Sequence, residues 1–330
     1  MAEILIQDKK RKPWLDALRA LALVFVIYGH SNAGFDNFFM YTSPVKIPLF
    51  FVISGYLFNP RDGRIKDFLK YLLRRIIVPW LVLTIGIQLL LVPFHGFGSW
   101  LIYVLQVLTG KTAWYVPCCI LAELLLFFMH KWCKHFGQLC VCCVVACIGG
   151  LVLAEFDLLN VCKINTALVV QIYLLLGMVL RRYEQRIFKL SWGLIAVVVY
   201  IIVCTICVLV FPGEGLDVNN NEYHHRFLLN LGMVASGTYG LFACASKWNG
   251  CSKVISFIGQ NTLVLYLLES PIKTVLFKLA SVLGVRIRLN WLTSLPLVVT
   301  VIGCGCAVVL ILNWLLPELL GKKRTARAAK

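Results

Sequence analysis

The chain has 330 residues, of which 60% are hydrophobic and 14% are charged. Apolar stretches of membrane-spanning length recur along most of it, and they leave too few polar residues to cover a soluble globule. The net charge of +17 is spread over short basic runs between these stretches, a pattern typical of membrane topology rather than of nucleic-acid binding. We therefore expect an integral membrane protein whose basic runs face anionic lipid headgroups or the phosphates of a cytosolic cosubstrate, with no nucleic acid as partner.

The fourteen cysteines fall mostly inside the apolar stretches, where a thiol packs as a small hydrophobic group. Neither a disulfide pattern nor a zinc-ligand spacing emerges, so we expect no metal site. The N-terminal sequence MAEILIQDKKRKPW lacks a signal-peptide cleavage region. The first apolar segment is therefore expected to remain as a membrane anchor.

Cutting the apolar runs at glycine, proline and charge clusters predicts an all-α membrane bundle of about ten transmembrane helices. The expected spans are residues 14–33, 46–59, 75–95, 112–130, 138–156, 164–180, 191–211, 227–246, 254–273 and 292–316. Residues 97–110 are a candidate interfacial or re-entrant piece, so the count can change by one or two. We expect one transmembrane domain over residues 14–316, between basic cytosolic tails at 1–13 and 317–330.

The distribution of basic residues supports this order of spans, because cytosolic loops carry an excess of Lys and Arg. With ten spans and residues 1–13 in the cytosol, 23 of the 32 Lys and Arg fall on the cytosolic side. We expect both termini in the cytosol and the protein in the cytoplasmic (plasma) membrane. The polar segment 212–226 then lies outside, where we expect a solvated loop rather than a metal or sugar site at Asp217, Glu222, His224 and His225.

Three polar residues interrupt the first span, LDALRALALVFVIYGH at residues 15–30. Because Arg19 and His30 are eleven residues apart, an α-helix places them about 20° apart around its axis and about 16 Å apart along it. Asp16 precedes Arg19 by three residues and can pair with it. The first span therefore carries one polar stripe, with Asp16 and Arg19 toward the cytosol and His30 near the opposite end.

Charged side chains at membrane depth are costly and generally face a bundle interior or a wet cavity, so the stripe indicates a functional site. Two structural interpretations stay open. Asp16 and Arg19 can form an ion pair that snorkels to the headgroups, and His30 can be an interfacial residue. Glu123 and Glu269 also fall within expected spans, where each must either pair with a buried cation or line an acceptor cavity.

Two segments follow the polar stripe, KIPLFFVISGYLFNP at 46–60 and FLKYLLRRIIVPW at 68–80. Together with Asp16, the Arg19-to-His30 spacing and the Gly29-His30 pair, they give the sequence a resemblance to the acyltransferase 3 family of membrane acyltransferases. Within that family the sequence resembles the fucose 4-O-acetylase-like branch. TAWYVPCCILAELLLFF at 112–128 and FIGQNTLVLYLLESPI at 257–272 are similar to two later family segments.

The resemblance implies transfer of an acyl group, usually acetyl, from cytosolic acyl-CoA to a hydroxyl of a glycan or lipid-linked sugar. A sugar hydroxyl is a poor nucleophile at neutral pH, so His30 is the expected general base. Arg19, beside Asp16, is expected to hold a phosphate or the pantetheine arm of the donor. Acyl-CoA is then a cosubstrate, and no tightly bound cofactor is expected. Since no nucleophile elbow is present, direct transfer without a covalent acyl-enzyme is the simpler expectation.

Two further groups near the stripe are candidates for binding the donor. Arg74 and Arg75 can bind the CoA phosphates as forked donors, or serve only as positive-inside anchors. Ser54 and Tyr56 flank Gly55, where we expect a close approach of two helices or a break in the backbone beside the site.

Candidate acceptor contacts lie toward the outer side. Trp114 and Tyr115 can stack on a sugar ring or belong to the interfacial aromatic belt. Lys46 and Glu269 stand at positions where members of the resembled family often carry His, and both bear on the identity of the acceptor. Glu269 is near the outer end of its expected helix, where contact with the substrate is possible.

Two other functions fit parts of the sequence. Ten spans with intramembrane charges also suit a transporter or exporter of a glycan or lipid-linked intermediate, although the chain has neither duplicated halves nor a matched pair of broken helices. An acyltransferase that acts on a non-sugar acceptor, such as an amino acid or peptide, is the second alternative.

Overall fold

The computed structural model describes residues 11–31, 37–60, 63–90, 92–213, 215–223, 226–248, 250–286, 289–290 and 292–320. It is 81% helical and contains no strand among these residues, which confirms the all-α membrane bundle. Residues 1–10 and 321–330, which make up most of the two expected basic tails, lie outside the described residues, as do His224 and His225.

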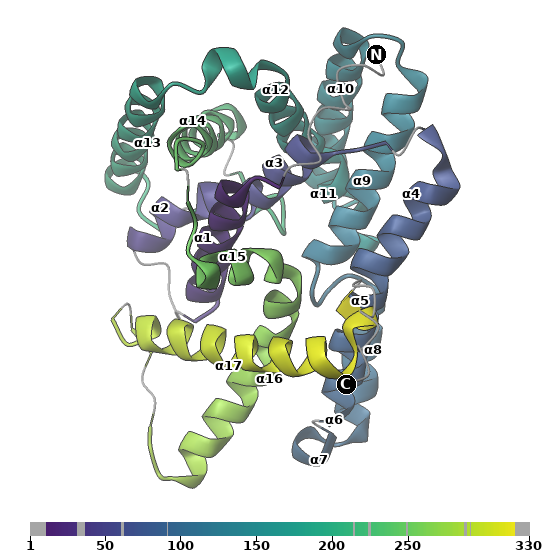
Figure 1. The fold of residues 1–330 in the computed structure, drawn as a ribbon, viewed down its shortest axis with the longest axis vertical. Helices are drawn as coiled ribbons and strands as arrows, with labels where there is room; N and C mark the ends of the chain where they lie inside the picture. The colour runs from purple at the N-terminus through teal and green to yellow at the C-terminus, as the bar shows by residue number, and fades with distance from the viewer. Residues whose placement is uncertain are drawn as a thin grey trace, which may run out of the picture.

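The helices follow one another along the chain, most of them with short connections (Figure 1). Their bounds are α1 (Pro13–Gly29), α2 (Asn37–Lys46), α3 (Pro48–Leu57), α4 (Ile65–Leu72), the π-helical turn η3 (Leu73–Ile77), α5 (Val78–Leu81), the π-helical turn η4 (Val82–Gly86), α6 (Ile87–Leu90), α7 (Val92–His95), α8 (Phe97–Leu108), α9 (Tyr115–Trp132), α10 (Phe136–Glu155), the 3₁₀ turn η5 (Val161–Lys163), α11 (Ile164–Val169), α12 (Gln171–Ile187), α13 (Leu190–Val210), α14 (Phe227–Ala245), α15 (Lys253–Gln260), α16 (Thr262–Val282), α17 (Ser294–Leu315) and the 3₁₀ turn η6 (Pro317–Leu320).

The helix α1 lies inside the bundle and contacts α2, α3, α14, α15, α16 and α17 (Figure 1). Its N-terminal end meets the ends of α3 and α12, because Lys12 donates hydrogen bonds to Tyr56 and Glu184, each at 2.8 Å. This contact is expected if successive spans cross the membrane in opposite directions, because the start of α1 and the ends of α3 and α12 then lie on the same side. Because other helices surround α1, its opposite faces contact different neighbours.

The predicted count of about ten spans is not confirmed. Six helices in the described part of the chain are long and apolar enough to cross a membrane, or seven if the pair 161–169 and 171–187, bent by 44°, is one span. Several expected spans fall short for a physical reason. α1 has only 17 residues, and α16 carries Glu269, Lys273 and Lys278. The apolar helix α8, in the candidate interfacial or re-entrant piece, has 12 residues, too few to cross the hydrocarbon core alone.

The second and third expected spans begin earlier than the sequence predicted. α2 leads directly into α3, so that residues 38–57 form one apolar stretch of 20 residues. Because Thr42 and Ser43 are polar, the sequence predicted that the span starts after them. Both side chains are buried in the structure. The third span is preceded by α4, and it contains the π-helical turns η3 and η4, which change the direction in which its side chains point.

The late span expected at 254–273 is broken at Asn261, between α15 and α16. Gly259, just before the break, packs against the backbone of α1, where an added Cβ would lie 2.0 Å from the Asp16 carbonyl oxygen. The Asn261 side chain donates a hydrogen bond of 2.7 Å back to the Phe257 carbonyl. A broken helix at membrane depth is tolerated where it is packed in protein or lines a cavity.

The outer segment expected as a solvated loop packs partly into the bundle. Leu216, Val218 and Tyr223 are buried, and Asp217 and Glu222 form an antiparallel bridge. The buried apolar side chains are interspersed with polar ones. The overall polarity of the segment therefore did not indicate that one side of it packs against the bundle. The segment is therefore partly buried, and the prediction of a solvated loop holds only for its exposed residues.

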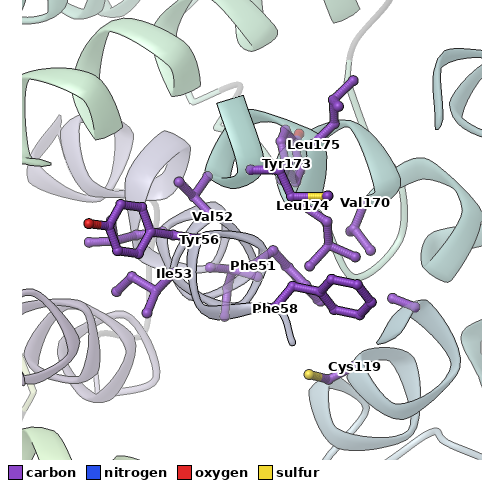
Figure 2. Close-up of a cluster of buried hydrophobic side chains, with 14 of the residues drawn as sticks. Phe51, Val52, Ile53, Tyr56, Phe58, Cys119, Val170, Tyr173, Leu174 and Leu175 are labelled. Atoms are coloured by element: carbon purple, nitrogen blue, oxygen red, sulfur yellow. The ribbon is translucent and has the colours of Figure 1, made fainter. Parts of the chain in front are cut away.

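The closest packing in the bundle joins α3 and α12, around the apolar cluster shown in Figure 2. A Cβ added at Gly55 would lie 2.0 Å from the Leu174 carbonyl oxygen, and one added at Gly177 would lie 2.0 Å from that of Val52. Two glycines thus let the two backbones touch, as small residues do at membrane helix interfaces. The close approach expected at Gly55 is confirmed.

We expect Gly55→Ala to destabilise the protein by about 3 kcal/mol, at the upper end for overpacking, because the added methyl meets backbone rather than a flexible side chain. Gly303→Ala is the matched control, since nothing lies within 4 Å of the position that its Cβ would take. Thermal unfolding in detergent measures both. Equal midpoints for the two variants would contradict the close contact of α3 with α12.

Candidate active site

The polar stripe of the first helix keeps its predicted geometry. α1 ends at Gly29, and His30 follows in helical conformation with its backbone N–H donating to the Val26 carbonyl at 3.0 Å. The helical period therefore extends through His30, and Arg19, Val26 and His30 share one face of α1.

His30 lies beside two charged residues of α16. Its Nδ1 atom is 3.0 Å and 3.1 Å from the two carboxylate oxygens of Glu269. Lys273 donates to the same carboxylate at 2.5 Å and to the His30 carbonyl at 3.1 Å. The Glu269 side chain is only 5% exposed, whereas that of His30 is 49% exposed. The buried carboxylate thus has a cation on one side and an accessible imidazole on the other.

The carboxylate defines which ring nitrogen of His30 can act on a substrate. An ionised carboxylate only accepts hydrogen bonds, so Nδ1 carries the proton that it shares with Glu269. In the neutral ring Nε2 is then the unprotonated nitrogen. A half-exposed imidazole in this state can accept a proton from a hydroxyl group.

Asp16 lies at the other end of the stripe and is buried. Its carboxylate accepts hydrogen bonds from Arg11 Nε at 3.0 Å and from Ser256 Oγ at 3.3 Å, and it is 3.7 Å from the Arg19 guanidinium. The side chain therefore connects the start of α1 to α15. It also supplies negative charge beside Arg19, which offsets part of the cost of placing that cation in the bundle.

A cavity of about 230 Å³ opens beside Arg19, walled by α1, α3, α4, η3, α9, α15 and α16. Four of the predicted site residues line it, namely Arg19, Ser54, Arg75 and Tyr115. Arg75 is exposed, and its guanidinium carbon is 5.9 Å from the centre of the Tyr71 ring. An exposed cation in the lining indicates that this end of the cavity reaches the surface.

The cavity approaches the His30 end of the stripe without including it. Its lining contains Val26, one helical turn before His30, and Tyr266, one turn before Glu269. It therefore begins at Arg19 and ends within about one turn of the His30–Glu269 pair. The described cavity thus covers the Arg19 level of the stripe and stops short of the His30 level.

Four other predicted residues lie outside the lining of this cavity. Tyr56 is buried near the start of α1, where it accepts a hydrogen bond from Lys12 and donates to Glu184 at 2.6 Å. Arg74 is exposed beside Arg75, and Trp114 packs edge-on against Tyr115. Lys46 has its ammonium 3.7 Å from the centre of the Phe39 ring and close to Gly29, near the His30 end of α1.

Several cavity residues were not singled out from the sequence: Tyr71, Cys119, Gln260, Thr262 and Tyr266. A helical signal in the sequence points to some of them, since Tyr115, Cys119 and Glu123 follow one another at intervals of four residues. The structure gives the two intramembrane glutamates different surroundings. Glu269 pairs with a cation, and Glu123 lines a cavity.

The fold and this cavity define a helical membrane protein with a polar site inside its bundle. Residues 12–314 match the family model described as the acyltransferase domain, Acyl_transf_3. The chain belongs to this acyltransferase 3 family, and it is an acyltransferase enzyme. No curated protein and no solved structure matches the chain.

We expect Asp16→Ala to lower stability by about 2 kcal/mol, because it removes a buried carboxylate and leaves two cations without their partner. Asp67→Ala is the control, since the Arg64–Asp67 pair is exposed and should contribute less than about 1 kcal/mol. Thermal unfolding in detergent compares the two. If both variants unfold at the wild-type temperature, Asp16 does not hold α1 against α15.

Proposed function

We propose that the protein transfers an acyl group, typically acetyl, from cytosolic acyl-CoA to a hydroxyl of a cell-surface or lipid-linked carbohydrate. The observation that carries this proposal is the contact of His30 Nδ1 with the buried Glu269 carboxylate, on the helix face that also presents Arg19 to the cavity. The pair provides a base, and the cavity provides a place for a donor. The proposal assigns His30 as general base and Arg19 as a donor-positioning residue.

The size of the cavity supports binding of one part of the donor. A volume of about 230 Å³ is below the roughly 300 to 1,000 Å³ of pockets that enclose a drug-sized ligand. It suits the pantetheine arm with its acyl group, while the nucleotide stays at the mouth. Arg75 at that mouth, with Arg74 beside it, can meet the phosphates, for which the guanidinium fork is well shaped.

The chemical step follows from the protonation state of His30. Nε2 takes the proton of the acceptor hydroxyl as the oxygen attacks the thioester carbonyl carbon. The tetrahedral intermediate then collapses, the carbon–sulfur bond breaks, and the imidazolium returns the proton to the CoA thiolate. Glu269 stabilises the positive charge that His30 carries between these two proton transfers. No covalent acyl-enzyme is needed.

The acceptor is assigned on the resemblance of the sequence to the fucose 4-O-acetylase-like branch. His30 lies at the end of α1 opposite to Asp16, so the acceptor approaches from the side of the membrane opposite to the donor. Lys46 lies near that end, and Trp114 packs against Tyr115 of the cavity; both are candidate acceptor contacts. A cytosolic donor also supports a location in the cytoplasmic (plasma) membrane.

His30→Ala and Arg19→Ala test the proposed roles. We expect each to lower acyl transfer from labelled acyl-CoA to surface glycan at least about 100-fold, the lower range for loss of a general base. His130→Ala, in the cytosolic half of α9, is the matched control and should keep full activity. Mass spectrometry of the glycans with each variant gives the acyl mass and the sugar together. Full activity of folded His30→Ala would contradict the mechanism.

Glu269→Gln separates a positioning role from contact with the donor. If the carboxylate holds and stabilises His30, kcat should fall at least about 10-fold while KM for acyl-CoA stays within about 2-fold. Steady-state kinetics on the purified enzyme in detergent give both constants. An unchanged kcat would exclude Glu269 from the site, and a raised KM with normal kcat would indicate donor binding instead.

A further inference from the structure

The face of α1 opposite to the polar stripe borders a second, larger hollow. This groove has a volume of about 650 Å³, lies between α1, α14 and α15, and is open along one side. Ala17, Leu21 and Val24 form its α1 wall. On the helix these residues point about 140 to 160° away from Arg19, so the groove is separated from the 230 Å³ cavity by α1 itself.

The lining of the groove is apolar except at one end. Lys247 is the one charged residue among its lining, and the exposed Trp248 lies beside it, where α14 ends. The remaining walls are aliphatic side chains, alanines and Cys244. Such a surface offers no hydrogen bonds to a sugar or a pantetheine amide. It suits a hydrocarbon chain whose polar end reaches a cation.

The position of Lys247 in the groove is consistent with the headgroup level of a membrane. Trp and Lys are enriched at the level of the headgroups, and basic pockets at the cytosolic ends of membrane helices bind anionic lipid heads. The positive-inside pattern puts Lys247 on that side. A groove that continues from this level along α1 and α14 is therefore aligned with a lipid chain in the inner leaflet.

We propose that this groove binds an anionic glycerophospholipid, with one acyl chain along α1 and the phosphate on Lys247. The lipid is neither acyl donor nor acceptor, because α1 separates it from Arg19 and His30. The lipid fills the space beside the small side chains of Ala17 and Ala20. It therefore packs against the face of α1 opposite to the polar stripe. The proposal stands independently of the acyl-transfer chemistry.

Lipid retention tests the proposal directly. The full-length protein is reconstituted in nanodiscs with an equal mixture of phosphatidylglycerol and phosphatidylethanolamine, then extracted in mild detergent, and its retained lipids are measured by native mass spectrometry. We expect about one phosphatidylglycerol per wild-type protein. Lys247→Ala should lower its retention at least about 5-fold, and Ala17→Phe, which fills the groove, should abolish it.

Two matched variants control for general effects of charge and bulk. Lys253→Ala removes an exposed cation that is outside the groove lining, and Ala235→Phe adds the same bulk to α14 away from it. Both should retain phosphatidylglycerol like the wild type. Equal retention by Lys247→Ala and Lys253→Ala would overturn the headgroup assignment, and equal retention by Ala17→Phe and Ala235→Phe would overturn the groove. Selective retention of phosphatidylethanolamine, or of a polyprenyl phosphate in protein taken from cells, would also overturn it.

Discussion

A charge placed inside a membrane protein must be paired or must face water, and this requirement organises the bundle around α1. The helix carries Arg19 near one end and His30 at the other, on a single face. Each has a buried carboxylate beside it, Asp16 at 3.7 Å and Glu269 at 3.0 Å. These carboxylates also connect α1 to α15 and α16. The carboxylate contacts that offset the cost of placing Arg19 and His30 inside the bundle therefore also hold α1 in position.

The two faces of α1 have opposite surroundings. The polar face borders a small cavity lined by Arg19, Arg75 and Glu123, and the apolar face borders a larger groove that ends at Lys247. A reactive site and a hydrocarbon surface are thus separated by the thickness of one helix. The residues that line the groove include alanines, and a helix with small residues on one side depends on its neighbours, protein or lipid, for rigidity.

The sequence was sufficient to predict the helical membrane fold, the shared face of Arg19 and His30, and the close approach at Gly55. These follow from composition and from the helical period, which act locally. It was not sufficient to predict the break at Asn261, the π-helical turns of the third span, or the contact of His30 with Glu269. Those features depend on packing between segments that are far apart in the chain, as where Gly259 meets the backbone of Asp16. The i, i+4 spacing of Tyr115, Cys119 and Glu123 shows that part of the cavity was accessible to the same helical reasoning.

In the proposed mechanism a donor bridges the two levels of the stripe, which are about 16 Å apart along α1. A cryo-EM structure of the enzyme with a non-transferable thioether analogue of acyl-CoA tests this bridging directly. We expect the pantetheine arm in the cavity beside Arg19 and Val26, with the carbon that replaces the thioester carbonyl directed at His30 Nε2. An arm bound in the groove on the other face of α1, or a reactive carbon that stays beside Asp16, would contradict it.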